Sequence, residues 1–225
     1  MNTSAPARPA ASVVVVRDGA RGLEVLLVQR NEKVAFHGGA WVFPGGRVDE
    51  ADRLEPDATP LDMAREAAAR EAREEAGLTL HPPALHYFSH WTTPADLPKR
   101  FATWFFVAPV VEDTPVVVDN SEIVAHQWAT PAEALALQRG GQMMLPAPTY
   151  VTLLRFAPWG DTRALLSHLA EAPVQTFIPR LVPVPTGRLA LYQEDAGYDA
   201  VDPGIAGPRH RLYMIDPDWD YQRNF

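Results

Sequence analysis

The sequence predicts an α+β protein, built as an α/β/α sandwich around a mixed β-sheet. Three observations predict this class. Two β-rich runs lie near the N-terminus with a Gly-bearing turn between them, a long Gly- and Pro-free stretch follows at 61–76, and further β-rich runs then give way to helical stretches. This order of strands, helix, strands and helices is typical of a sheet covered by helices on both faces.

The N-terminal part predicts a hairpin. Residues 1–10 are Ala- and Pro-rich and are expected to be disordered, whereas 11–17 and 23–29 are β-rich runs on either side of the polar turn 18–22. Residues 31–40 are expected to form a loop. The short strand 41–43 is then expected to stop at a Pro-Gly-Gly turn over 44–46.

The stretch 61–76 is the most distinct helix in the sequence, because it is rich in Ala, Glu and Arg and Gly77 follows it as a C-terminal cap. The expected strands after it are 84–91, 101–110 and 122–128. The expected helices are 130–139, which opens with the capping-box pair Thr130 and Glu133, then 149–156 and 161–171. We divide the chain into a main domain over 11–144 and an extension over 145–225 of helices and short strands packed on the same domain.

Composition limits the classes of function. The chain has 20 Lys and Arg against 28 Asp and Glu, a formal charge of −8, so no basic surface is expected to hold a nucleic acid. It has no cysteine, which excludes disulfides and thiolate chemistry. The apolar run at 13–16 is too short to be a signal peptide or a membrane span, and we therefore expect a cytoplasmic protein without a membrane partner.

Three glutamates of the predicted helix converge on one turn. Residues three and four apart lie on the same face of a helix, so Glu71, Glu74 and Glu75 share a small volume. A hard divalent ion with oxygen ligands is a natural neutraliser of such a cluster. The alternative is an ordinary solvated helix with a surface ion pair from Arg70 to Glu74. A second stripe of alanines, at 64, 68, 72 and 76, predicts close packing of this helix on the sheet.

The motif Arg70-Glu71-Ala72-Arg73-Glu74-Glu75-Ala76-Gly77-Leu78, downstream of Phe43-Pro44-Gly45-Gly46, resembles the Nudix box of the Nudix hydrolase superfamily. The resemblance implies that Glu71, Glu74 and Glu75 bind Mg²⁺ or Mn²⁺, that the Gly46 carbonyl contributes to the metal site, and that Arg70 holds a carboxylate of the box in place. It also implies that relatives often pair as dimers, so a homodimer is open for this chain.

The sequence departs from the plain motif at one place. Between Gly46 and Arg70 lie 23 residues, about ten more than the motif contains, and its first acidic position has no clean equivalent. Counting forward from Gly46 reaches Asp52, whereas counting backward from Arg70 reaches Asp62. Both assignments stay open.

An expanded box followed by 90–94 (His-Trp-Thr-Thr-Pro) and 99–106 (Lys-Arg-Phe-Ala-Thr-Trp-Phe-Phe) is similar to the Nudix branch of the peroxisomal coenzyme A diphosphatases and their bacterial relatives. The Arg that coenzyme A-type motifs place before the Phe-Pro-Gly-Gly turn has no counterpart, because 31–42 contains no Arg. Coenzyme A is therefore one expected substrate among several.

Several other side chains have two interpretations each. Glu122 lies at the start of a predicted strand and is either the general base or a strand-edge charge, while Glu71 is either a metal ligand or the base. Lys99 and Arg100 either contact phosphates or are turn charges. His90 and Trp91 either line a binding wall or pack inside, and Arg30 stays unassigned.

The function expected from these features is divalent-metal-dependent hydrolysis of a diphosphate linkage in a nucleoside diphosphate joined to another moiety. Coenzyme A or an acyl derivative is the favoured substrate, and ADP-ribose or a dinucleotide comes next. The alternative is a non-catalytic Nudix-fold module that senses a nucleotide. Retention of Glu71, Glu74 and Glu75 together favours the enzyme.

Overall fold

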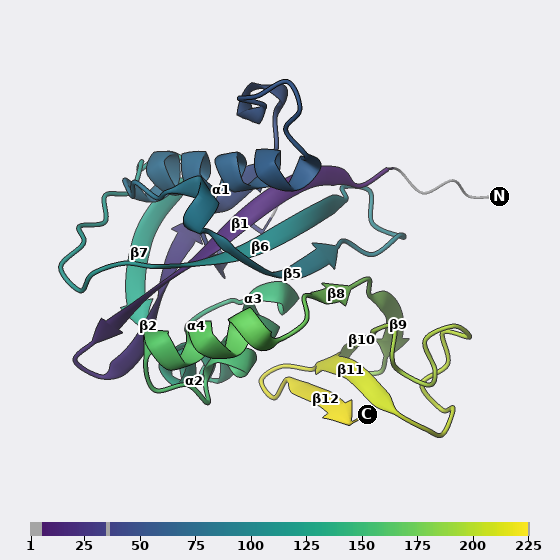
Figure 1. Cartoon of the computed structure of the whole chain (residues 1–225). Coiled ribbons are helices and arrows are strands. Elements are labelled where there is room, and N and C mark those ends of the chain that lie inside the picture. Colours follow the sequence, from purple (N-terminus) through teal and green to yellow (C-terminus); the bar gives the residue numbers. More distant parts are fainter. Residues whose placement is uncertain (1–5, 35–36, 225) are drawn as a thin grey trace.

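The computed structural model describes residues 6–34 and 37–224 and contains two β-sheets, the larger of which has helices on both faces (Figure 1). Most strands of the larger sheet follow the order β3-β2-β1-β6-β5-β8, with β4 added beside β1 and β7 beside β2. Its strands are β1 (Arg8–Gly19), β2 (Gly22–Arg30), β3 (Trp41–Val42), β4 (Gly45–Arg47), β5 (His86–Thr92), β6 (Phe101–Pro109), β7 (Ile123–Ala129) and β8 (Gln175–Phe177). The pairs β1/β6 and β5/β8 are parallel and the others antiparallel, so the predicted mixed sheet is confirmed.

Strand β1 separates two apolar cores because its side chains alternate between the two faces of the sheet. Val13 and Val15 face α1 (Pro60–Ala76), whereas Val14 and Val16 face the opposite core. All four predicted alanines of α1 are completely buried against the first of these faces. A helix whose contact stripe is made of alanine approaches the sheet closely, which brings its glutamates near the strands.

The opposite core is covered by three helices and the second sheet. The helices are α2 (Pro131–Arg139), α3 (Ala147–Phe156) and α4 (Thr162–Glu171). The second sheet is antiparallel, in the order β12-β11-β10-β9, and its strands are β9 (Arg180–Val184), β10 (Gly187–Leu191), β11 (Arg209–Met214) and β12 (Asp220–Asn224). Figure 1 shows this sheet, in green to yellow, beside β8 and below the larger sheet. The extension shares one apolar core with the rest of the chain.

Helix α1 begins and ends as its sequence dictates. The Thr59 hydroxyl accepts from the Asp62 backbone N–H and the Asp62 carboxylate accepts from the Thr59 N–H, which forms a capping box at the N-terminus. At the other end Gly77 has φ of 69°, the left-handed conformation that a C-terminal cap requires.

Two expectations for the N-terminal part are wrong in detail. Strand β1 begins at Arg8, so 8–10 are not disordered, because Arg8, Pro9 and Ala10 pair with the first three residues of β6. Residues 1–5 lie outside the described residues. The expected Pro-Gly-Gly turn is in fact the short strand β4, since the long β1 offers it a free edge over 10–12.

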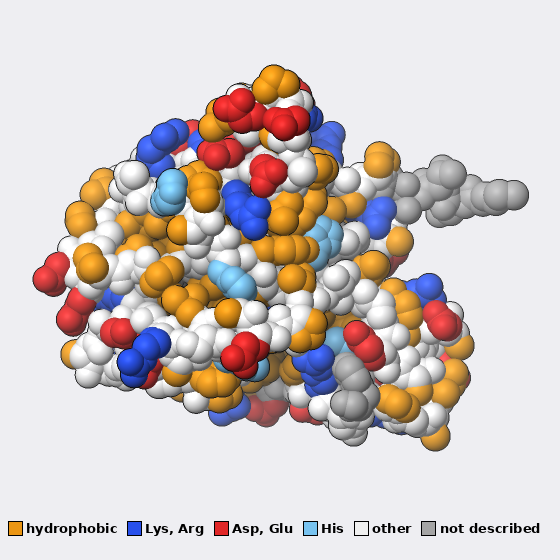
Figure 2. All heavy atoms as spheres, in the orientation of Figure 1, with side chains coloured by type: hydrophobic (Ala, Val, Ile, Leu, Met, Phe, Trp, Pro, Cys, Tyr) orange, Lys and Arg blue, Asp and Glu red, His pale blue; other side chains and the backbone are white. Residues whose placement is uncertain are grey.

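The expansion before α1 forms a projection of its own. It contains the single 3₁₀ turn η1 (Glu50–Asp52), and a second turn, η2 (Pro82–Ala84), follows α1. Figure 2 shows acidic side chains gathered over this projection, which stands above α1 in Figure 1. The exposed acids of this segment include Asp49, Glu50, Glu55 and Asp57.

Candidate active site

Arg70 is the centre of an ion-pair network on α1. Its guanidinium donates from Nε to Asp52 Oδ1 (2.9 Å) and from Nη2 to Asp52 Oδ2 (3.2 Å), while Nη1 donates to Glu71 (2.8 Å) and Glu74 (3.1 Å). The Asp52 bond is the largest of the causes that raise the pKa of Arg70. A planar fork with two parallel bonds to one carboxylate fixes the guanidinium, which in turn positions Glu71.

The structure distinguishes the two aspartates that the sequence left open. Asp52 is only 4% exposed, because η1 folds back over α1 and brings its carboxylate to Arg70. Asp62 lies at the first turn of α1, is exposed, and caps the helix. Asp52 is therefore the acid that belongs to the Arg70 network.

Two glutamates approach the glycine strand β4 from α1. The Gly45 backbone N–H donates to Glu75 Oε2 (2.9 Å), and a side-chain carbon at Gly46 would overlap the Glu71 carboxylate. Glycine is required at Gly45, where a side-chain carbon would overlap the Ala11 carbonyl, and at Gly46 a side chain would displace the Glu71 carboxylate. Burial raises the pKa of Glu71, and burial together with the neighbouring charges of Glu71 and Glu122 raises that of Glu75 to about 8. The positive charges of the protein therefore neutralise the negative charges of Glu71 and Glu75 only in part.

Arg30 and Glu122 reach the same place from the strands β2 and β7. Arg30 at the end of β2 donates to Glu122 Oε1 (2.5 Å), just before β7, and its Nη1 lies 4.0 Å from Glu75 Oε1. Glu122 is half exposed, and its charge is one of the causes that raise the pKa of both Glu71 and Glu75. The strand pairing of β2 with β7 thus joins residues that are far apart in the sequence.

The donor set of this site fits a hard divalent cation in kind. All the donors are oxygens, and two of the carboxylates are largely buried without sufficient positive charge. In the part of the chain that the structure describes, no three acidic or histidine side chains are already grouped as a metal site. Here the carboxylates have protein partners instead, since Arg70 holds Glu71 and Glu74, and Gly45 holds Glu75.

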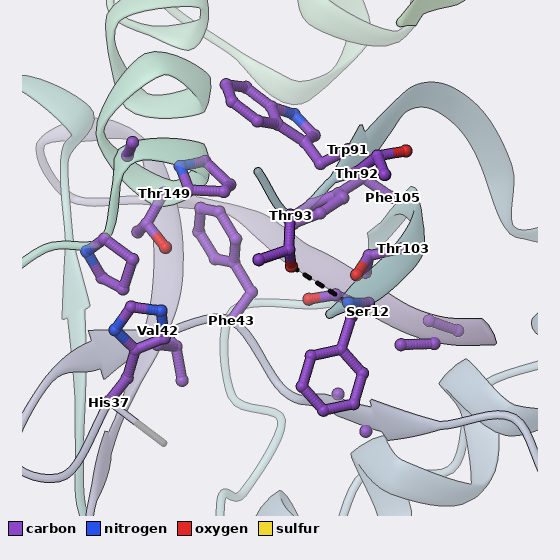
Figure 3. A pocket seen from close by; sticks show the side chains of 18 of the residues that line it. Ser12, His37, Val42, Phe43, Trp91, Thr92, Thr93, Thr103, Phe105 and Thr149 are labelled. Atoms are coloured by element: carbon purple, nitrogen blue, oxygen red, sulfur yellow. Dashed lines mark hydrogen bonds between the residues drawn. The ribbon is translucent and has the colours of Figure 1, made fainter. Parts of the chain in front are cut away.

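A cavity of about 580 Å³ opens beside this site. At one end it is lined by Glu71, Gly46, Arg30 and Glu122. Figure 3 shows His37 and Thr149 along one side of the cavity and Thr92, Phe105 and Thr103 along the other. The volume and the mixture of apolar walls with a few charged groups are typical of a small-molecule site.

Other predicted residues divide between the cavity and its surroundings. Trp91 lines the cavity, whereas His90 points to the other face of β5 and packs edge-on against Trp104 at 5.1 Å. Lys99 and Arg100 do not line it, and Arg100 donates to the Thr93 carbonyl at 3.3 Å. Glu74 is exposed and outside the lining.

The sequence left the role of two contributors to the cavity open. Arg30 lies at the end of β2, beside β3, and lines the cavity. The extension was expected either to cover the active site or to build a partner surface, and its residues do line the cavity through tertiary packing.

The family model described as the NUDIX domain matches residues 6–146, which is more than half of the chain. The chain belongs to the Nudix family. The expected membership, the α+β fold and the class of Nudix pyrophosphohydrolase are confirmed.

Curated relatives and solved structures agree with this membership. The chain is 26% identical to the acyl-coenzyme A diphosphatase NUDT19 of Homo sapiens, covering 80% of this chain and 73% of that protein. It is 26% identical to the protein of the same name from Xenopus laevis, covering 57% of this chain and only 36% of that protein. A Nudix hydrolase structure from Alicyclobacillus acidocaldarius superposes with a TM-score of 0.65 at 24% identity over 75% of this chain and 99% of that one, which shows the fold. No helix among the described residues is long and apolar enough to cross a membrane.

Proposed function

We propose that this Nudix protein hydrolyses the diphosphate linkage of a nucleoside diphosphate joined to another moiety, in a reaction that depends on Mg²⁺ or Mn²⁺. The observation that carries the proposal is the meeting of Glu71, Glu75 and Glu122 with Arg30 at one end of a cavity large enough for such a substrate. Water adds across one P–O–P bond, so the products are two phosphate monoesters.

Glu71, Glu74 and Glu75, with the carbonyl of Gly46, would hold the cation. When bound, a divalent cation supplies charge neutralisation for the phosphate oxygens and lowers the pKa of a bound water. Glu75 is positioned by the Gly45 N–H, and Glu71 by Arg70, so each carboxylate has a fixed starting place. Exposed Glu74 is the ligand that has to turn furthest from solvent toward the site.

The cationic side chains of the lining are suited to the substrate phosphates. Arg30 and Arg47 line the same end of the cavity as Glu71, and a guanidinium binds phosphate oxygens in a bidentate manner. Arg30 holds Glu122 in the described structure. An arriving phosphate would compete with Glu122 for Arg30, which would release the carboxylate at the moment the substrate is in place.

Glu122 is our choice for the general base. It lines the cavity, lies near Glu71 and Glu75, and is half exposed, so it can reach a water that also contacts the substrate. Glu71 is the alternative base, but its bond to Arg70 and its proximity to Gly46 favour a ligand role.

Coenzyme A or an acyl derivative is the proposed first substrate, with ADP-ribose or a dinucleotide next. The curated relatives from human and frog carry the name acyl-coenzyme A diphosphatase, and the apolar walls of the cavity suit a substrate with an apolar part. The Arg expected between the first strands and the glycine strand is absent from 31–42, but Arg30 ends the strand before that segment and lines the cavity.

The test is a panel of substrates incubated with purified protein and Mg²⁺ or Mn²⁺. We expect coenzyme A to give adenosine bisphosphate and phosphopantetheine, and a chelator to stop their release. ADP-ribose, NADH and a dinucleoside polyphosphate complete the panel. If no member of the panel released a monoester, the proposal would be contradicted and a nucleotide-sensing module would be favoured.

A further inference from the structure

The charged and the uncharged residues of the cavity lining come from different parts of the chain. Every charged side chain in it comes from residues 30–122, within the part that the family model matches. The extension contributes none. Its lining residues are all uncharged: Pro146, Ala147, Pro148, Thr149, Pro179, Leu181, Ala190, Tyr192 and Met214.

The second sheet presents one apolar face to the cavity. Ala190 of β10 is directly opposite Leu181 of β9 and Leu212 of β11, and directly opposite residues share a face of a sheet. Met214, two residues beyond Leu212, lies on the same face. Leu181, Ala190 and Met214 all line the cavity, whereas Val182, the next residue of β9, does not. Ala190 has the smallest side chain of these lining residues and so leaves space in front of it.

This face is held rigidly against the first sheet. Trp91 stacks on Phe177 of β8 with ring centroids 3.9 Å apart, and Tyr192 meets both rings edge-on. Beyond Tyr192, the buried Asp195 accepts two bonds from Arg211, at 2.7 and 2.6 Å. The wall is therefore formed by packing before any ligand arrives.

The wall is suited to an aliphatic chain and unsuited to a nucleobase. A base needs an open aromatic face and hydrogen-bond partners for its edge. Here one face of Trp91 is covered by Phe177, and the Tyr192 side chain is fully buried. Thr149 is the other extension residue of the lining with a polar side chain, and it too is buried.

We propose that the extension forms a subsite for the aliphatic part of the moiety joined to the diphosphate, and that this subsite makes a medium-chain acyl-coenzyme A a better substrate than free coenzyme A. The inference rests on the proposed function. The charged end of the cavity would hold the diphosphate, while the face of Leu181, Ala190 and Met214 removes the acyl chain from water.

Two substitutions and one matched control test this subsite. Ala190→Leu fills the space in front of the wall, and Leu181→Gln makes the wall polar at a partly exposed position that tolerates the change. Val182→Leu enlarges a neighbouring side chain on the opposite face of the same strand, away from the cavity. Circular dichroism and thermal unfolding confirm that each variant is folded.

The measured quantity is the ratio of kcat/KM for octanoyl-coenzyme A to that for free coenzyme A. We expect the ratio to exceed one in the wild type and to fall about tenfold in both variants. Ala190→Leu occupies space that the acyl chain would take, and Leu181→Gln replaces an apolar contact of the chain by a polar group. The loss of kcat/KM should be larger for octanoyl-coenzyme A than for free coenzyme A in both variants, so that the ratio reports on the acyl chain alone. Val182→Leu should keep the wild-type ratio.

Two results would overturn the subsite. An unchanged ratio in both variants would mean that the chain lies elsewhere. Equal losses for octanoyl-coenzyme A, free coenzyme A and ADP-ribose would mean that the wall holds the nucleotide that they share. Calorimetric titration of the protein with the two coenzyme A species gives the same comparison without turnover. A binding preference for the octanoyl species that the variants lose, in a protein that hydrolyses neither, would keep the subsite and contradict only the proposed function.

Discussion

Replacing Asp52 by Asn tests whether this residue fixes Arg70 and, through Arg70, positions Glu71. Asp52 Oδ1 accepts from Arg70 Nε, and Oδ2 accepts from both Arg70 Nη2 and the Asp49 backbone N–H. All three partners are donors. In Asp52→Asn the side-chain amide presents donors of its own to one or two of them, so the change removes the negative charge and at least one hydrogen bond.

The size of the loss follows from the burial of the carboxylate. A hydrogen bond to a charged group contributes about 1.5–3 kcal/mol, and breaking a buried ion pair by removing one partner costs about 3–5 kcal/mol. Arg70 keeps Glu71 and Glu74 as partners, so its charge is not left alone. We therefore expect the free energy of unfolding to fall by about 2–3 kcal/mol, which lowers the Tm of a chain of this length by about 4–12 °C.

The assay combines urea unfolding followed by tryptophan fluorescence with steady-state kinetics on coenzyme A. Because Asp52 fixes the guanidinium that positions Glu71, kcat/KM should fall about tenfold to a hundredfold, as for partners that orient metal ligands. Asp62→Asn is the matched control. It changes an exposed cap and should give a smaller loss of stability with wild-type kinetics.

The reasoning is refuted if the two variants behave alike, or if Asp62→Asn is the one that lowers kcat/KM. Either outcome would mean that the site does not depend on Asp52, the acid that Arg70 binds.

Three further predictions concern the glutamates. Glu75→Gln should lower kcat by about a thousandfold or more by removing a metal ligand, while Glu66→Gln on the same helix should stay active; comparable activity in both would contradict the metal assignment. Glu122→Gln should lower kcat by about a hundredfold to ten-thousandfold with an unchanged circular dichroism spectrum, as expected for a general base, and a wild-type kcat would transfer that role to Glu71. For metal-free protein, the Tm should fall as the pH rises from about 5 to 8. Burial raises the pKa of Glu75 to about 8 in the folded state, so the folded state still binds a proton there that the unfolded state has already released. The Tm of Glu75→Gln measured over the same pH range should vary less, and an equally steep fall in that variant would exclude Glu75 as the cause.

Features set by local chemistry were predictable from the sequence. The spacing of the alanines and of the glutamates on 61–76 follows from the period of the helix, so the buried stripe and the converging acids were both expected. The pair Thr59 and Asp62 also carries a capping pattern, and this pattern was a sufficient signal to remove Asp62 from the site.

Features set by contacts between distant segments were not predictable. The pairing of Asp52 with Arg70 depends on how the expansion folds back over α1. The capping box of Asp49 and Asp52 shapes the turn η1 itself, but it does not direct that turn over the helix. The extension reaches the cavity because β8 pairs in parallel with β5, placing Phe177 beside Trp91. Parallel pairing across such a separation leaves no local signature in the sequence.

The Pro-Gly-Gly segment was predicted to be a turn but contains the strand β4. Its glycines nevertheless allow the close approach of the backbone that the site needs. Glycines indicate either a turn or a close approach of the backbone, and the sequence alone favoured the turn. In the structure β4 lies along β1, where a side chain at Gly45 would overlap the Ala11 carbonyl and one at Gly46 would overlap the Glu71 carboxylate. The same lack of side chains that suggested a bend lets a strand fit between β1 and α1. The motif therefore couples sheet to helix, and the position of the carboxylates depends on β4 as much as on the helix that carries them.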